Sequence, residues 1–241
     1  ASVGNAPYFK VRIPAGAACN SDVQINVQIH ADQGSWPGTS FTHTIGQLIP
    51  GNFTALNESF GSGIPATWTV VNGGSGGGAA ATWTAANPGN RAIAPPMAAP
   101  VVIVDSDAAG LGPTQNEELI TPALNLATTT SVTLEFDQFF NWYDFGNSEI
   151  GDVDVRSSAT GNNWVNVLRQ QNGDSPNPDH KTLNITAQAA GATNVQVRFH
   201  YYQAAFEKWW MVDNVKVTAV APPACNNAVC TGAPGVAKAA N

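Results

Sequence analysis

The chain is a series of short segments with the alternating pattern of β-strands, separated by turn-forming residues, and this feature most constrains its fold. Two such segments, 195–202 and 209–217, flank a short polar turn near the C-terminus. Helical periodicity is nowhere sustained over about ten residues. Clusters of Gly, Pro, Asn and Ser separate the other candidate strands, which are 68–71, 81–84, 101–104, 118–121, 132–140, 153–157, 164–168 and 180–185. The series predicts an all-β fold, a jelly-roll β-sandwich.

Composition narrows the class of protein. The chain has 241 residues, of which 11% are charged, and a formal net charge of −7. No basic cluster favours nucleic acid, and no run of about 18 apolar residues could cross a membrane. The sequence starts at Ala1 without an apolar leader, which indicates that a leader or a larger precursor segment has been removed. We therefore expect a secreted or cell-surface protein.

The first 50 residues carry three further strand patterns, at 8–13, 23–30 and 40–45. The second alternates strictly between apolar and polar side chains, so one face is apolar. Three strands with one apolar face rarely form a stable domain, so we expect this segment to pack on the following domain or on a partner. The predicted organisation is a β segment over 1–50, a jelly-roll domain over 51–220 and a Pro/Gly/Ala-rich tail over 221–241.

Three cysteines are present, an odd number for a secreted chain. Cys225 and Cys230 are close together in the tail and are predicted to form a disulfide bond. Cys19 would then be left alone or bonded to a segment outside this sequence.

An acidic residue interrupts the last strand pattern where it should be buried. Asp213, followed by Asn214, lies between the apolar residues of segment 209–217. A buried carboxylate without a partner costs several kcal/mol. In secreted β-sandwiches that partner is often Ca²⁺, which prefers carboxylate and carbonyl oxygens. The sequence therefore predicts a bound calcium ion.

Seven motifs occur in an order that identifies a family resemblance. They lie at 58–60, 63–68, 104–107, 119–126, 153–158, Trp164 and 210–215. Together they resemble the cleaved-adhesin, or choice-of-anchor-J, modules of secreted bacterial proteins, which are similar to MAM domains. The resemblance covers about residues 55–219. Residues 1–50 resemble the closing strands of an immunoglobulin-like module whose first half is missing.

The resemblance implies a structural calcium site between the first and last strands of the sandwich. Matched by position, Glu58 is the acid of the first strand and Asp213 the acid of the last. Asp105 and Asp107 form an Asp-x-Asp spacing that can place two carboxylates on one ion. The alternative for each of these acids is a solvated turn residue or a helix cap.

The sequence contains no arrangement that predicts catalysis, so no catalytic residue is assigned. The His-Glu-x-x-His motif of zinc hydrolases and the Gly-x-Ser-x-Gly motif of serine hydrolases are both absent. Glu149 with Asp152 or Asp154 could serve a glycosidase. Asp152 and Asp154 would share one face of a strand, however, which is more typical of a solvated or ion-binding edge.

Aromatic residues gather in the loop after segment 132–140 and around the last turn, and Trp142, Tyr143 and Trp209 are the candidate ligand-binding residues. Flat rings beside Asn, Gln and Asp suit sugars or a protein interface, although such rings can also close the ends of a sandwich. We expect a non-catalytic, calcium-stabilised adhesion or assembly module with a protein partner or neighbouring subunit. The alternatives are a carbohydrate-binding accessory domain of a secreted hydrolase and a subunit of an extracellular filament or surface complex.

Overall fold

The computed structural model describes residues 18–143 and 149–226. These residues divide into two compact units, of which the larger spans Gly51–Pro222. The smaller contains the described residues 18–50 and 223–226. The strand predicted at 8–13, Cys230 and most of the predicted tail lie outside the described residues. No helix in the described ranges is long and apolar enough to cross a membrane.

The smaller unit contains an antiparallel hairpin of β1 (Ser21–Ala31) and β2 (Gly34–Ile45). Both strands were predicted, and each is longer than its sequence pattern. Val23, Ile25 and Val27 are half-buried whereas the residues between them are exposed, as the strict alternation requires. Two strands do not define an immunoglobulin fold, so that part of the resemblance stays a prediction.

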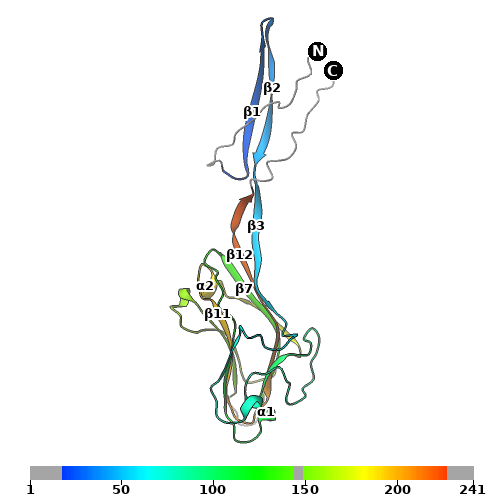
Figure 1. Ribbon diagram of the computed structural model, residues 1–241, viewed down its shortest axis with the longest axis vertical. Coiled ribbons are helices and arrows are strands. Elements are labelled where there is room, and N and C mark those ends of the chain that lie inside the picture. The colour runs from blue at the N-terminus through cyan, green and yellow to red at the C-terminus, as the bar shows by residue number, and fades with distance from the viewer. Residues whose placement is uncertain (1–17, 144–148, 227–241) are drawn as a thin grey trace. The chain divides into compact units, whose positions relative to one another are not determined.

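The larger unit is a sandwich of two antiparallel five-stranded sheets (Figure 1). The first sheet has the order β10 (Asp179–Asn184), β7 (Ser131–Asn141), β12 (Trp209–Asn226) and β3 (Gln47–Glu58), with β5 (Val102–Asp105) also paired to β12. The second has the order β4 (Thr69–Asn72), β6 (Gln115–Ile120), β11 (Gln196–Ala204), β8 (Ile150–Arg156) and β9 (Val165–Gln170). The all-β sandwich predicted from the sequence is confirmed.

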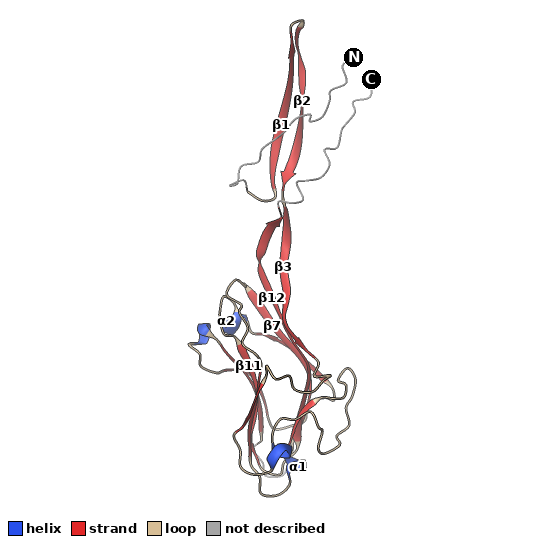
Figure 2. Cartoon of the chain, in the orientation of Figure 1, coloured by secondary structure: helices blue, strands red, loops and turns tan. Residues whose placement is uncertain are grey.

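The helical elements of the described chain are single turns (Figure 2). They are η1 (Gly78–Ala81), α1 (Ser106–Ala109), η2 (Ser158–Thr160) and α2 (Thr186–Ala189). Each connects strands or closes an end of the sandwich, and none contributes a layer. Asp105 caps α1 by accepting a hydrogen bond from the backbone N–H of Ala108 at 2.9 Å.

Aromatic side chains from both sheets form the centre of the core. Phe136, Phe140, Phe199 and Trp210 are fully buried. The ring of Phe199 packs edge-on against Phe136 and Trp210, at centroid distances of 5.2 and 5.8 Å. These contacts join β7 and β12 of the first sheet to β11 of the second. The period of two in the strands places alternate residues inward, so the pattern read from the sequence builds the core directly.

One predicted strand differs from the structure. The strand predicted at 81–84 is absent: η1 ends at Ala81, and only Thr84 forms a bridge, with Ile103. The glycine-rich run before it favours turns, since Gly76, Gly77 and Gly78 all have positive φ. The sandwich predicted over 51–220 lies close to the larger unit, Gly51–Pro222, although β3 starts before residue 51 and β12 continues past residue 220.

The outer face of the first sheet carries two groups of polar side chains. Residues of β7 and β12 face one another in register: Thr133 opposite Thr218, Glu135 opposite Lys216, and Asp137 opposite Asp213. Between Asp213 and Lys216 the register shifts, because Asn214 and Val215 of β12 lie opposite the single residue Phe136 of β7, so β12 has one extra residue there. This β-bulge separates an acidic group of side chains from a hydroxyl-rich one.

Candidate functional site

The bulge in β12 holds Asp213 in place. Its carboxylate accepts hydrogen bonds from the backbone N–H of Ala98, at 2.9 Å, and of Asn214, at 2.8 Å. Asn214 adopts a positive φ of 51°, and its side-chain amide donates to the carbonyl of Pro96 at 3.3 Å and to Asp137 at 2.8 Å. The buried carboxylate anticipated from the sequence is therefore satisfied in part by the backbone of the 96–98 loop.

Two other carboxylates act on Asp213. Burial raises the pKa of Asp213, the two backbone hydrogen bonds oppose that shift, and the negative charges of Asp137 and Glu58 raise the pKa further. Asp137 also pairs with His180, at 2.8 Å. Neither Glu58 nor Asp213 forms an ion pair within the described ranges. The predicted pair of Glu58 and Asp213 is thus brought within electrostatic reach.

Asp105 and Asp107 belong to a different group of side chains. Nε of Arg91 lies 2.8 Å from Asp105, and Nη2 of Arg91 lies 2.6 Å from Asp107. A second bond joins Nη2 to Asp105 at 2.9 Å, so the guanidinium binds Asp105 with two nitrogens. An arginine side chain therefore supplies positive charge at this pair, where the sequence predicted a calcium ion.

The four predicted calcium ligands consequently do not form one site. Glu58 and Asp213 fit part of a calcium shell, since both offer carboxylate oxygens and lack a cationic partner among the described residues. Asp105 and Asp107 do not fit, because the guanidinium of Arg91 already binds both of them. Residues 18–143 and 149–226 contain no group of three or more His, Cys, Asp or Glu side chains arranged for a metal ion. A calcium ion at Glu58 and Asp213 would need carbonyl and water oxygens as well.

The predicted aromatic ligand-binding residues are only partly available. The guanidinium carbon of Arg91 lies 3.9 Å from the ring centroid of Trp209, which covers one face of that indole. Lys208 places its ammonium nitrogen 5.4 Å from the Tyr143 ring and 5.8 Å from the Trp209 ring. Trp142 packs against the main core. Trp209 and Tyr143 therefore both lie near the ammonium group of Lys208, and Trp142 serves packing.

A buried acidic pair was not assigned from the sequence. Glu149 accepts hydrogen bonds from the hydroxyl of Tyr201 and the backbone of Lys208. Burial raises the pKa of Glu149. Burial also raises the pKa of Glu207 to about 7, with a further contribution from the charge of Glu149. Glu207 follows an exposed turn in the sequence, so no local pattern indicates that it is buried.

The outer face of the second sheet is occupied by ion pairs. Arg169 binds Asp152 through two nitrogens, at 2.9 and 2.7 Å. Arg198 binds Asp154, at 2.7 Å, and also Glu118. Asp152 and Asp154, the carboxylates considered with Glu149 for glycoside cleavage, are thus each held by an arginine. We call this surface the ion-paired face.

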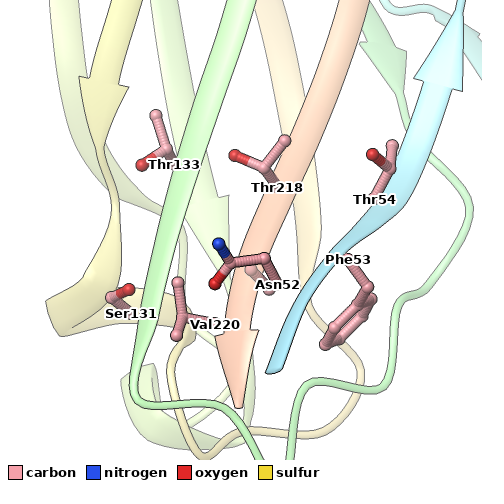
Figure 3. Close-up of a pocket in the computed structure, with 8 residues that line it drawn as sticks. Asn52, Phe53, Thr54, Ser131, Thr133, Thr218 and Val220 are labelled. Atoms are coloured by element: carbon pink, nitrogen blue, oxygen red, sulfur yellow. The ribbon is translucent and has the colours of Figure 1, made fainter. Parts of the chain in front are cut away.

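The outer face of the first sheet instead contains a groove, with a volume of about 320 Å³, across β7, β12 and β3. Figure 3 shows Thr133, Thr218 and Thr54 in one row across the three strands, with Ser131, Val220 and Asn52 in a second. Phe53 and Ala219 complete the lining. We call this the polar groove. It was not predicted from the sequence, because its residues come from three distant segments.

One disulfide prediction needs correction. Cys19 is disulfide-bonded, whereas the predicted Cys225–Cys230 bond left it without a partner in this chain. Because the chain has only three cysteines, a bond from Cys19 within the chain excludes that predicted pair. The side chains of Cys225 and Cys230 lie outside the described residues.

Comparison with solved structures places this geometry in a known fold. The structure is similar to the K3 cleaved adhesin domain of Lys-gingipain from Porphyromonas gingivalis, with a TM-score of 0.52 and 25% sequence identity. The sandwich unit has the fold of a cleaved adhesin domain. The match covers 70% of this chain and 99% of that domain, which confirms the resemblance predicted for the sandwich.

Two further structures are more distant. The K1 cleaved adhesin domain of Lys-gingipain gives a TM-score of 0.48 at 24% identity, covering 68% of this chain and 97% of that one. TmCBM61 in complex with beta-1,4-galactotriose gives 0.44 at 14% identity, with 68% and 97% covered. No protein-family model and no curated protein sequence matches the chain.

Proposed function

We propose that the chain is a non-catalytic extracellular module that functions in adhesion or assembly. The observation that carries this proposal is the similarity of its sandwich unit to the whole of a cleaved adhesin domain. The acidic residues are consistent with it, since Asp105, Asp107, Asp152 and Asp154 are each engaged by an arginine. Carboxylates neutralised in this way stabilise a structure and are poorly suited to transfer protons.

The proposal requires that the chain contact another macromolecule. Sedimentation velocity over a wide concentration range would detect assembly with itself or with a co-purified subunit. Binding of the fluorescently labelled chain to intact bacterial and animal cells would detect adhesion. A chain that stays monomeric and binds no cell surface would contradict the proposal, as would turnover of a glycoside or peptide substrate.

Calcium is the second part of the proposal, now restricted to Glu58 and Asp213. The support is electrostatic: Asp213 is buried, and the charges of Glu58 and Asp137 act on it without a matching cation on either Glu58 or Asp213 in the described structure. A divalent cation would remove that repulsion and join the first strand of the sandwich to the last. Asn214 would keep Asp137 oriented through their 2.8 Å hydrogen bond.

Thermal unfolding with calcium or with a chelator tests this part. Calcium at a hundred times its dissociation constant should stabilise the wild type by about 2.7 kcal/mol. The Asp213→Asn variant should lose that gain, whereas Asp107→Asn should retain it because Asp107 pairs with Arg91. Equal calcium responses in wild type and Asp213→Asn would reject the site.

Carbohydrate binding is the second candidate function, and the polar groove is the observation that favours it. The groove is large enough for a small ligand and is lined by hydroxyl and amide side chains. Two of the aromatic residues first considered for this role are less suitable, since Arg91 covers one face of Trp209 and Trp142 packs against the core.

A further inference from the structure

The side chains of the polar groove have unused hydrogen-bonding capacity. Five of its lining residues carry a hydroxyl or an amide, namely Asn52, Thr54, Ser131, Thr133 and Thr218. None of these side chains forms a hydrogen bond with another described residue. These side chains are exposed or half-buried, so they are solvated in the free protein and can exchange water for a ligand.

The groove also lacks charge. None of its eight lining residues is acidic or basic. The adjacent pair on the same face, Glu135 and Lys216, lies 3.6 Å apart, so its charges offset one another. A charged ligand would therefore lose hydration without gaining an ion pair. The chemistry favours a neutral ligand with many hydroxyl groups.

Apolar and polar atoms alternate along the groove. The threonines offer a methyl group beside each hydroxyl, and Val220 lies between Ser131 and Asn52 (Figure 3). Phe53 is 42% exposed at the rim. A sugar ring presents the same alternation, with C–H faces and equatorial hydroxyls. The lining residues lie on paired strands, so little ordering is needed on binding.

We propose that the polar groove is a binding site for a neutral carbohydrate, of the size of a short oligosaccharide. This inference deepens the carbohydrate-binding alternative and rests on it, whereas the adhesion and calcium proposals do not depend on it. Thr133 and Thr218 would bond ligand hydroxyls from the centre of the groove, Asn52 and Thr54 would bond them from β3, and Phe53 would pack on a ring face.

Calorimetric titration of the full chain with cellotriose, xylotriose and maltotriose, and with trigalacturonate as an acidic probe, tests the inference. We expect at least one neutral trisaccharide to bind, with trigalacturonate at least tenfold weaker. Thr218→Val keeps the side-chain shape but removes the hydroxyl, and should weaken binding about tenfold. The double variant Thr133→Val, Thr218→Val should abolish detectable binding. Thr69→Val, on exposed β4 of the second sheet, is the matched control and should bind as the wild type does.

Three outcomes would overturn the inference. One is binding of none of the neutral sugars by a chain that melts cooperatively. Another is binding that both groove variants leave unchanged, which would retain carbohydrate binding as a function but move it elsewhere. The third is a preference for the acidic probe. The cell-binding and sedimentation experiments do not depend on sugar binding in the groove. A chain that fails to bind sugars can therefore still support the adhesion proposal.

Discussion

The outer faces of the two sheets use polar residues in opposite ways. On the ion-paired face, Arg169 binds Asp152, and Arg198 binds Asp154 and Glu118. In the polar groove, neutral hydroxyls are left without a partner among the described residues. Satisfied polar groups fix a structure, whereas unsatisfied ones at the surface remain available to a ligand. The comparison teaches that charge content alone does not locate a binding surface.

The largest effect should come from the ion-paired face. Arg198→Met keeps the aliphatic length but leaves Asp154, which is 4% exposed, without its cation. We expect a loss of about 3 kcal/mol in the free energy of unfolding, measured by urea denaturation. Lys216→Met is the control from the first sheet, where both partners are partly exposed, and should cost less than about 1 kcal/mol. Equal losses in the two variants would break the comparison.

A smaller effect concerns Glu207, a buried acid with no ion-pair partner in the described structure. Its pKa is raised from 4.5 to about 7, so the folded chain keeps a proton that the unfolded chain releases. Stability should therefore fall as the pH rises from about 4.5 to about 7 and then level off, by about 2 kcal/mol after allowance for partial solvation. Glu207→Gln cannot ionise and should show a smaller decline. Parallel pH profiles for both proteins would contradict the assignment.

The smallest effect on stability is expected in the polar groove. Thr133→Val and Thr218→Val remove hydroxyls that bond to no described side chain, so each should change the unfolding free energy by less than about 0.5 kcal/mol. Urea denaturation of both variants beside Thr69→Val measures this. A loss above about 1 kcal/mol would show that the hydroxyls have a structural partner, and would weaken the contrast between the two faces.

Local alternation in the sequence was sufficient to predict the all-β fold class. The period-two pattern of 132–140 and 195–202 defines β7 and β11, and it places Phe136, Phe140 and Phe199 in the core. The proximity of Glu58 and Asp213 also followed from the order of motifs along the chain. The core positions could be predicted because the alternating pattern lies within a single strand. The pairing of Glu58 with Asp213 could be predicted because the family resemblance supplies the arrangement of the first and last strands.

The features that escaped prediction depend on contacts between distant segments. Arg91 lies in a loop without periodicity, 14 residues before Asp105, and nothing local indicates that it would bind that carboxylate. The polar groove requires that β12 lie between β7 and β3, which only the sheet order determines. Cys19 illustrates the same limit, because the predicted Cys225–Cys230 bond left it without a partner in this chain, whereas it is disulfide-bonded.

The lining of the polar groove has a practical consequence for producing the protein. Asn52 and Thr54 are the ends of the tripeptide Asn-Phe-Thr, an acceptor sequence for N-linked glycosylation. A eukaryotic secretory pathway would attach its own oligosaccharide to a side chain inside the groove. Protein produced in such a host would carry a covalently attached glycan in the groove where soluble sugars are expected to bind. The choice of expression host therefore decides which surface an experiment can interrogate.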